Sequence, residues 1–395
     1  MTRARPLVAH VTTTDISLEV LLGTQLEAFA RAGYDVVGIS APGPYVAALE
    51  RRGIRHVPLA QATRSMAPTR DARAFAELVR VFRRERPAIV HTHNPKPGVY
   101  GRIAGRVARV PVVVNTVHGL YAEPGDRLTK RALVYTAERV ASAFSHAELV
   151  QNPEDLETLR RLRVPARKLR LLGNGIDLTR FDPASVTAEE RQRARRELGA
   201  SGVSDVVVGL VGRLVREKGY PEVFDAARRL KDRMPELRFA VIGGADDEKA
   251  DALSAEDRAN ASAAGVRMLG WRDDVVELYS GMDLFVLASH REGFPRGAME
   301  AAAMGLPAVV TDVRGCRQVV DDGMTGRRVP ARDAGALAAA IEALARDPEC
   351  RRDMGAAARV KAGREFDVQR SIEITLETYD RLLRERGRPR VPSVP

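Results

Sequence analysis

The feature that most constrains the fold is an alternation of short apolar runs with amphipathic stretches, which is completed once in each half of the chain. Short apolar runs are typical of buried strands, and apolar residues at helical spacing are typical of helices that cover a sheet. Strands that alternate with helices predict parallel sheets of the doubly wound type. We therefore expect an α/β fold with two Rossmann-like domains that face a cleft, with ligands at the carboxyl ends of the strands.

The expected elements divide the 395 residues into two domains. In the first half the predicted strands cover residues 7–11, 35–39, 88–91, 112–117, 147–150 and 168–172. In the second half they cover residues 206–211, 238–242, 266–269, 284–287, 308–311 and 326–329. Helices are expected, among others, over residues 71–85, 189–198 and 368–386. We predict an N-terminal domain over 1–180, a connection within 173–205, a C-terminal domain over 203–365 and a flexible tail over 387–395.

The basic charge of the chain is confined to its first half. Residues 1–180 hold 28 Lys and Arg against 16 Asp and Glu, a net charge of +12, which leaves −1 of the total +11 for the remainder. Such a field favours an anionic partner, which could be nucleic acid, anionic lipid or a phosphorylated substrate. An arginine-rich composition without any partner would give the same count. An aromatic content of 5% and the lack of a recognised nucleic-acid motif argue against nucleic acid.

Two absences narrow the class of protein further. No apolar run approaches the roughly 18 residues of a membrane-spanning helix, and the first residues read as a strand rather than a signal peptide. The two cysteines, Cys316 and Cys350, form neither a metal-ligand spacing nor a disulfide framework. We expect a cytoplasmic protein with two free thiols.

Two carboxylates, Glu292 and Glu300, lie eight residues apart around a predicted helix start that follows the strand at 284–287. Pro295 suits the first helical turn, where its missing N–H is not needed. The backbone amides around Gly293 and Phe294 would then point outward from a helix N-terminus, a place where phosphate binds readily. A carboxylate further along the helix can accept two hydrogen bonds from a ribose diol. The alternative is a helix whose acidic residues only favour its N-terminus.

Two cations, Arg213 and Lys218, follow Gly212 and the predicted strand at 206–211. Together with a helix N-terminus they suit a diphosphate without a metal. The loop has neither the Walker A pattern nor the dinucleotide Gly-x-Gly-x-x-Gly pattern. No Asp-x-Asp occurs in the chain, which argues against a metal-dependent nucleotide-sugar site of that type. The alternative is two surface cations on a loop.

Polar loops also follow two predicted strands of the first half. His118 leaves the strand at 112–117 and is expected to face the cleft, although a buried histidine of the core would show the same pattern. His91 and His93 lie two residues apart, and no third metal ligand is evident beside them. We favour a substrate loop over residues 91–98, in which Lys96 meets a phosphate.

The segment Gly270, Trp271 and Arg272 follows the predicted strand at 266–269. A backbone loop at this place could read the edge of a nucleobase. A single tryptophan more often has a packing role.

Taken together, these motifs resemble the retaining glycosyltransferases of the GT-B fold, family 4. The resemblance runs along nearly the whole chain, through His-Thr-His at 91–93, Val-His-Gly at 117–119, Gly-Asn-Gly-Ile-Asp at 173–177, Gly-Arg-Leu at 212–214, the Glu292 and Glu300 pair, and Gly-Cys-Arg at 315–317. The segments 93–98 and 315–317 further resemble the bacterial capsular polysaccharide and lipid-linked oligosaccharide branch.

The resemblance implies a role for each matching donor-side position. Arg213 and Lys218 would hold the donor diphosphate, Glu300 the ribose and Glu292 the transferred sugar. His118 would lie at the donor sugar. The donor-binding set would also include Gly212, Gly270, Trp271, Arg272, Gly293, Phe294 and Pro295. The last helix would cross back to the first domain. No metal and no cofactor are expected, because the nucleotide-sugar is a substrate.

The acceptor side is predicted less directly. We expect the acceptor to meet residues of the polar loops, namely Asp15, His93, Asn94, Lys96 and Asn174. The sequence departs from many family members at residues 12–17, where Thr-Thr-Thr-Asp-Ile-Ser stands in place of a glycine pair. The contacts that glycine amides make there in other members are therefore not carried over.

These expectations lead to one favoured function and three alternatives. The favoured one is metal-independent transfer of a hexose or N-acetylhexosamine, with retention, from a nucleotide-sugar to a polyprenyl-pyrophosphate-linked acceptor in polysaccharide biosynthesis. UDP is the preferred nucleotide. The basic helix at 71–85 would bind the inner face of an anionic membrane peripherally. The alternatives are a glycosyltransferase with a soluble or phospholipid acceptor, a sugar-nucleotide epimerase of the same fold, and a nucleic-acid binding module.

Overall fold

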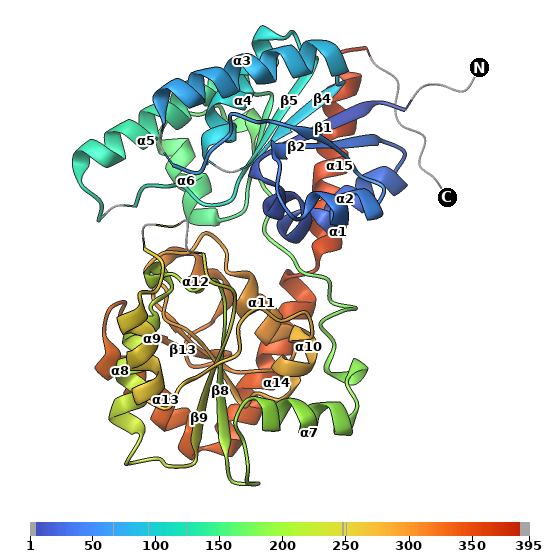
Figure 1. Cartoon of the computed structure of the whole chain (residues 1–395). Helices are drawn as coiled ribbons and strands as arrows, with labels where there is room; N and C mark the ends of the chain where they lie inside the picture. Colours follow the sequence, from blue (N-terminus) through green and yellow to red (C-terminus); the bar gives the residue numbers. More distant parts are fainter. Residues whose placement is uncertain are drawn as a thin grey trace. The chain divides into compact units, whose positions relative to one another are not determined.

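The chain divides into two compact units, Met1–Gly173 with Val368–Pro395 and Asn174–Asp367 (Figure 1). The computed structural model describes residues 5–65, 67–93, 95–123, 125–246, 249 and 251–387. Among these residues, no helix combines the length and the apolar character that crossing a bilayer requires.

The first unit is built on a parallel sheet of seven strands in the order β3-β2-β1-β4-β5-β6-β7. The strands are β1 Leu7–Thr14, β2 Asp35–Ala41, β3 Arg55–Pro58, β4 Ile89–Thr92, β5 Val112–Val117, β6 Ala147–Val150 and β7 Leu169–Leu171. Strands β4, β5 and β6 are buried along their whole length, as expected for a parallel sheet covered on both faces.

The sheet of the first unit is covered by helices from the whole length of this unit. They are α1 Gly23–Arg31, α2 Val46–Arg51, α3 Pro68–Glu85, α4 Pro95–Val107, α5 Leu128–Ala141, α6 Pro153–Arg161 and α15 Val368–Arg384. The last of these returns from the end of the second unit. Its residues Ile372, Tyr379 and Leu383 share one buried cluster with Val8 of β1 and Val114 of β5.

The second unit repeats the plan with a parallel sheet of six strands in the order β10-β9-β8-β11-β12-β13. The strands are β8 Val206–Val211, β9 Leu237–Ile242, β10 Arg267–Met268, β11 Leu284–Leu287, β12 Ala308–Thr311 and β13 Gly326–Val329. The helices are α7 Ala188–Glu197, α8 Tyr220–Leu230, α9 Ala255–Ala263, α10 Val275–Ser280, α11 Arg296–Ala303, α12 Arg314–Val319, α13 Ala334–Arg346 and α14 Pro348–Glu365.

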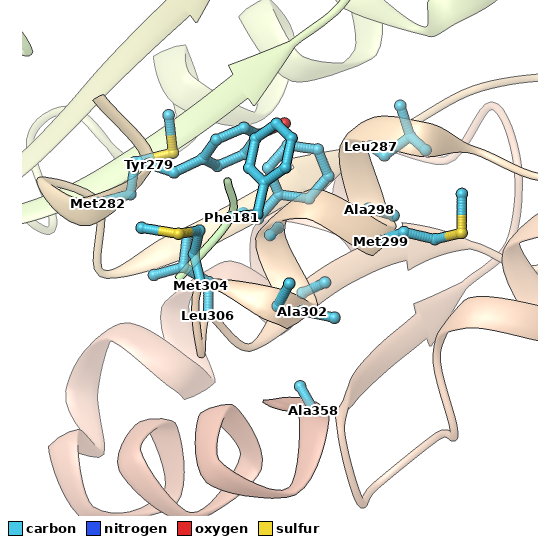
Figure 2. Close-up of a cluster of buried hydrophobic side chains, with 14 of the residues drawn as sticks. Phe181, Tyr279, Met282, Leu287, Ala298, Met299, Ala302, Met304, Leu306 and Ala358 are labelled. Carbon is cyan, nitrogen blue, oxygen red and sulfur yellow. The ribbon is translucent and has the colours of Figure 1, made fainter. Parts of the chain in front are cut away.

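Apolar side chains fill both faces of the second sheet. Figure 2 shows part of the cluster on one face, in which Phe181 and Tyr279 lie beside Met282 and Met304. A separate cluster on the other face joins Val208 and Val286 to Leu230 of α8 and Ile341 of α13. Because the pattern of buried residues is continuous on both faces, the carboxyl edge of the sheet is left for function.

The predicted α/β class with two parallel sheets is confirmed, and every predicted strand is present with small changes at its ends. One strand was missed by the sequence analysis. β3, Arg55–Pro58, lies at the edge of the first sheet and contains a proline and an arginine, so its apolar pattern is weak. α3 begins at Pro68, earlier than predicted, because a proline is accommodated at the first turn of a helix. The predicted tail lies mostly outside the described residues.

Candidate functional site

In the second unit, a glycine allows the loops that follow β8 and β11 to approach each other closely. Gly219 has a φ of 72°, and a Cβ at this position would lie 1.9 Å from the carbonyl oxygen of Ala288. Only glycine fits, because the conformation is left-handed and the space is filled by backbone. The close approach brings the short helix Arg216–Lys218 against the loop that carries Glu292.

Lys218 and Glu292 form an ion pair across these two loops. Lys218 Nζ donates to Glu292 Oε1 at 2.5 Å, and the Ser289 hydroxyl donates to the same oxygen at 2.7 Å. The side chain of Lys218 is 22% exposed and that of Glu292 is 9% exposed. The two residues are 74 positions apart, and both were singled out from the sequence. A partly exposed cation held at the carboxyl end of two strands is placed to meet an anionic ligand.

The segment before α11 is fixed by a second close approach. A Cβ on Gly315 would lie 2.7 Å from backbone atoms of Gly293, and the amide of Gly315 donates to the carbonyl of Glu292 at 3.2 Å. This contact explains the small residue in the Gly-Cys-Arg segment. Pro295 is the N-cap residue of α11, which begins at Arg296. The sequence analysis placed Pro295 inside the first turn, so the predicted start of this helix was one residue too early. Because proline has no backbone N–H, it adds no hydrogen-bond donor at the N-cap.

Glu300 lies in the second turn of α11, one side of which packs against the end of β8. The hydroxyl of Tyr279 donates to Glu300 Oε2 at 3.0 Å, and Arg296 Nε lies 3.7 Å from Glu300 Oε1. Burial and the neighbouring Glu300 carboxylate raise the pKa of Tyr279 well above its usual value, so this hydroxyl remains a donor. A carboxylate with one oxygen held by a tyrosine keeps lone pairs for a diol.

Arg213 is the more exposed of the two predicted cations. Its Nη1 donates to Asp246 Oδ2 at 2.7 Å, and 48% of its side chain is exposed. The loops that follow β8 and β9 also lie against each other, because a Cβ on Gly243 would be 1.8 Å from the carbonyl oxygen of Gly212. Gly243 in turn donates to the carbonyl of Gly270 at 2.8 Å.

The remaining predicted donor residues differ in what they contact. The ring of Trp271 is 53% exposed and lies beside Gly244, so it presents a face to the carboxyl edge of the sheet. The guanidinium of Arg272 is bound by the carboxylates of Glu197 and Asp274. These two ion pairs give Arg272 a structural role that the sequence did not suggest.

In the first unit, histidines from β1 and β4 lie close to histidines that follow β4 and β5. His10 pairs in register with His91, and His93 follows two residues later on the same face. His10 Nδ1 lies 3.0 Å from His93 Nε2, and His93 Nδ1 lies 3.0 Å from His118 Nε2. His10 is a third potential metal ligand beside His91 and His93, and the sequence analysis did not identify it.

All four histidines in this cluster are neutral near pH 7. Burial lowers the pKa of His10 to about 3, and lowers the pKa of His91 and His93 well below the usual value. Burial also lowers the pKa of His118 to about 4, against an opposing interaction with Gln151. Each ring therefore carries one N–H and one lone pair.

Three of the predicted acceptor residues are used to hold loops. Lys96 forms an ion pair with Asp71 and donates to the carbonyls of Thr63 at 2.9 Å and Ser65 at 2.7 Å. Asp15 is buried and accepts from the amides of Ile16 at 2.9 Å and Tyr45 at 2.7 Å. Asn174 belongs to the second unit, where its Nδ2 donates to the carbonyl of Phe294 at 3.2 Å.

The structure thus brings Lys218 together with Glu292, and His93 together with His118. The predicted substrate loop over residues 91–98 is wrong in its second half, because α4 begins at Pro95. Lys96 in the first turn of α4 holds the segment around Thr63, and Asp15 holds the segment around Tyr45. Asn94 lies outside the described residues. Sequence reasoning missed Asp246, Tyr279 and Ser289, because none of them stands in a distinctive sequence pattern. It also missed Tyr379, which reaches the histidines from a helix 288 residues away from His91.

Comparison with known proteins gives matches along both units. Residues 18–180 match the family described as Glycosyltransferase Family 4, and residues 191–361 match Glycosyl transferases group 1. The chain is 31% identical over 320 residues to a glycosyltransferase, EpsD, of Bacillus subtilis, with 80% of this chain and 82% of that protein covered. It is 26% identical over 388 residues to the capsular polysaccharide biosynthesis glycosyltransferase CapM of Staphylococcus aureus, with 96% and 98% covered.

A third relative is the UDP-Gal:alpha-D-GlcNAc-diphosphoundecaprenol alpha-1,3-galactosyltransferase of Escherichia coli, which is 29% identical over 322 residues, with 80% of this chain and 81% of that protein covered. Among solved structures, Anabaena HepE in complex with UDP and glucose superposes with a TM-score of 0.78 at 20% identity, with 95% and 99% of the two chains covered. This structural likeness bears on the fold alone.

Proposed function

We propose that this chain, which belongs to the family 4 glycosyltransferases of the GT-B fold in the branch that builds capsular and lipid-linked glycans, transfers a sugar from a UDP-sugar to a polyprenyl-pyrophosphate-linked acceptor with retention at the anomeric carbon. The observation that carries the proposal is the Lys218–Glu292 pair beside the start of α11. The choice of UDP is supported by the E. coli relative, which is named as a galactosyltransferase that uses UDP-Gal.

The proposed reaction separates charge at the donor. The sugar gains oxocarbenium character, and negative charge collects on the leaving diphosphate. Cations already fixed in the site stabilise that charge more strongly in the transition state than in the ground state. Lys218 and Arg213 are the residues that we assign to this task, with Glu292 and Asp246 holding them in place before the donor binds.

Glu292 and Glu300 have separate tasks in this proposal. Glu292 shares one oxygen with Lys218 and Ser289, and its other oxygen is available to a hydroxyl of the transferred sugar. Glu300, held by Tyr279, binds the ribose diol. The leaving phosphate takes the proton of the incoming acceptor hydroxyl on the same face of the sugar, so the new bond keeps the anomeric configuration. In this mechanism the cationic side chains neutralise the diphosphate without a metal ion.

The first test is nucleotide binding. We expect UDP to raise the melting temperature of the purified protein, since a ligand present at 100 times its Kd stabilises the folded state by about 2.7 kcal/mol. GDP, ADP, TDP and NAD serve as the other arms of the panel. The shift with UDP should be lost in Glu300→Ala and retained in Glu256→Ala, which removes an exposed carboxylate from α9 of the same unit.

The outcomes separate the candidate functions. A shift with NAD alone, or with no nucleotide, would contradict the donor-site assignment. Turnover of the UDP-sugar to an isomer without any acceptor would indicate an epimerase instead. Full activity on a soluble acceptor in the absence of lipid and detergent would indicate the soluble-acceptor alternative.

Because the proposed acceptor is linked to a lipid, we expect the chain to bind an anionic membrane surface, and we assign this binding to α3. Arg70, Arg73, Arg80 and Arg83 are exposed on this helix and form no ion pair within the part of the chain that the structure describes. Each cation near anionic lipid contributes about 1 kcal/mol. Replacing Arg73 and Arg80 by Gln should therefore weaken binding to anionic vesicles by roughly 30-fold, as measured by flotation at low salt.

A matched pair of substitutions in the second unit serves as the control. Arg191→Gln with Arg193→Gln removes two exposed charges from α7 and should leave vesicle binding unchanged. Binding of the unaltered protein should also weaken as salt rises, because surface charges are screened. Equal binding by both double variants, or no binding to anionic vesicles at all, would contradict the membrane proposal.

A further inference from the structure

The amino edge of the first sheet, where its strands begin, gathers basic side chains that the proposed function does not use. His146 directly precedes β6, and Lys168 directly precedes β7. Arg106 lies in the last turn of α4, and Arg386 follows α15. We call these four residues the basic cluster. The amino edge of a parallel sheet lies opposite its carboxyl edge, so the basic cluster is separate from the candidate site residues of the first unit.

His146 is held in the basic cluster by the backbone of β5. Its amide donates to the carbonyl of Val113 at 2.7 Å, and the amide of Val113 donates to His146 Nδ1 at 2.8 Å. Nδ1 therefore carries a lone pair. Burial, and after it the charges of the other three members of the cluster, lower the pKa of His146 to about 4, so the ring is neutral near pH 7. A neutral ring with a lone pair on Nδ1 has its proton on Nε2.

The Nε2–H group of His146 meets a second donor. Arg106 Nη1 lies 3.0 Å from His146 Nε2. A guanidinium group carries five N–H donors and no acceptor, so neither nitrogen offers a lone pair to the other. Protonation of the ring would only add a second positive charge to this contact. An anionic oxygen at about 2.8 Å from both nitrogens would accept from each of them, and would replace a contact between two donors by two charge-assisted hydrogen bonds.

The other members of the basic cluster add positive charge and no acceptor. Lys168 Nζ donates to the carbonyl of Ser142 at 2.8 Å. Burial and the neighbouring arginines lower the pKa of Lys168, against an opposing interaction with Glu148, whose carboxylate is bound by Arg102. Within the part of the chain that the structure describes, no member of the cluster forms an ion pair with a carboxylate. The cluster therefore offers several N–H donors and a concentrated positive charge to an anion.

Arginines in the left-handed backbone conformation add charge to the same edge of the sheet. Arg86 follows α3, Arg109 follows α4 and Arg163 follows α6, with φ angles of 50°, 61° and 58°. All three side chains are exposed, and each residue leads into a strand of the first sheet, namely β4, β5 and β7. Glycine is the usual residue after a helix in this conformation, because a side chain is strained there.

Other helices of the chain are followed by glycine in this conformation. Gly33 follows α1 with a φ of 93°. In the second unit Gly199 follows α7 and Gly265 follows α9, with φ angles of 102° and 77°. A positive charge near a helix C-terminus is itself favourable, but α4 already carries Arg106 in its last turn. The strained backbone at Arg109 is therefore a second, independent indication that a positive charge at this edge has a function.

We propose that the basic cluster binds a phosphate group, one oxygen of which accepts hydrogen bonds from both Arg106 and His146. Lys168 and Arg386 supply further charge and N–H donors to the other oxygens. Phosphate is the chemistry that fits, because its several anionic oxygens match the N–H groups of an arginine and of the neighbours that surround it. The phosphate belongs either to a soluble phosphorylated molecule or to a lipid headgroup. This site lies within the first unit and does not rest on the proposed function.

The experiment follows His146 by nitrogen NMR of the histidine-labelled protein while inorganic pyrophosphate is added. The His146 signals, identified by their loss in His146→Asn, should shift until the site is saturated. The pKa of His146 should rise on binding, because a neighbouring anion favours the imidazolium form. Since the signal belongs to one ring, it reports on this site whether or not the donor site also binds pyrophosphate. Arg106→Gln with Lys168→Gln should weaken the binding about tenfold or more, because two charged donors are lost.

Arg31→Gln with Arg51→Gln is the matched control, because these exposed arginines lie in the last turns of α1 and α2 and carry the same total charge. It should leave pyrophosphate binding unchanged. Vesicles that contain phosphatidic acid identify the source of the phosphate: if they displace pyrophosphate from His146 the ligand is a lipid headgroup, and if they do not it is soluble. His146 signals that ignore pyrophosphate, or that respond equally to chloride at the same ionic strength, would overturn the proposal, as would equal weakening in both double variants. A response at His146 in a protein that binds no UDP would contradict only the proposed function.

Discussion

Lys218→Ala should lower kcat by two to three orders of magnitude, because it removes a preorganised cation from the leaving diphosphate. The loss of one such donor typically costs about 2.7–4 kcal/mol of transition-state stabilisation. Lys218 is held at 2.5 Å from Glu292, so in the unaltered protein its ammonium group is fixed before the donor arrives. Steady-state kinetics with the nucleotide-sugar and acceptor measure the effect, and kcat should fall together with kcat/KM.

The same argument applies to Arg213, whose guanidinium is held by Asp246. Arg213→Ala is expected to show a loss of the same order as Lys218→Ala. Arg229→Ala provides the control, since it removes an exposed guanidinium of α8 that pairs with Asp225. If the two loop variants keep rates near those of Arg229→Ala, the diphosphate lies elsewhere and the donor-site assignment is wrong.

The donor side of the candidate site was the part most open to prediction from the sequence. Its residues follow β8 and β11 directly, so the carboxyl ends of two predicted strands locate them. Gly219, which allows the two loops to approach, stands in the segment after β8, whereas Gly315 contacts the loop after β11 from the start of α12. The pairing of Lys218 with Glu292 could not be read from the sequence, because it depends on the side-by-side order of β8 and β11.

The first unit shows why the rest could not be predicted. Strand alternation places His91 and His93 on one face, but their partner His10 is on another strand and Tyr379 on the last helix. Lys96 was predicted to meet a phosphate from its charge and its place in a loop. Its ion pair with Asp71 depends on how α3 and α4 pack, which local pattern does not encode.

The largest expected effect on stability comes from Arg102, the bulkiest fully buried side chain among the described residues. Its guanidinium donates to Glu148 at 2.8 Å and to Glu138 at 2.7 Å, and its Nε bonds to the carbonyl of Gly98. Removing one partner of a buried ion pair leaves an uncompensated charge and costs about 3–5 kcal/mol. Arg102→Met should therefore lower the free energy of unfolding by that amount, as measured by urea denaturation.

Two further variants separate lost charge from lost packing. Arg106→Met removes an exposed arginine one turn later on α4, whose Nη1 lies 3.0 Å from His146 Nε2, and it should cost less than 1 kcal/mol. Adding Glu148→Gln to Arg102→Met should recover part of the loss, because the fully buried carboxylate at position 148 is then no longer left without its partner. A double variant as unstable as Arg102→Met alone would indicate that lost packing, and not the unpaired carboxylate, sets the cost.

The position of this network ties the stability of the first unit to its function. Glu148 also accepts from Asn115 Nδ2 at 2.8 Å, and Asn115 Oδ1 accepts from the Thr92 hydroxyl at 2.8 Å. Thr92, the last residue of β4, pairs in register with Asn115 of β5, and His93 and His118 follow them within three residues. Loss of Arg102 should therefore loosen the backbone that carries His93 and His118. We expect the folded fraction of Arg102→Met to retain less activity per molecule than that of Arg106→Met at the same temperature.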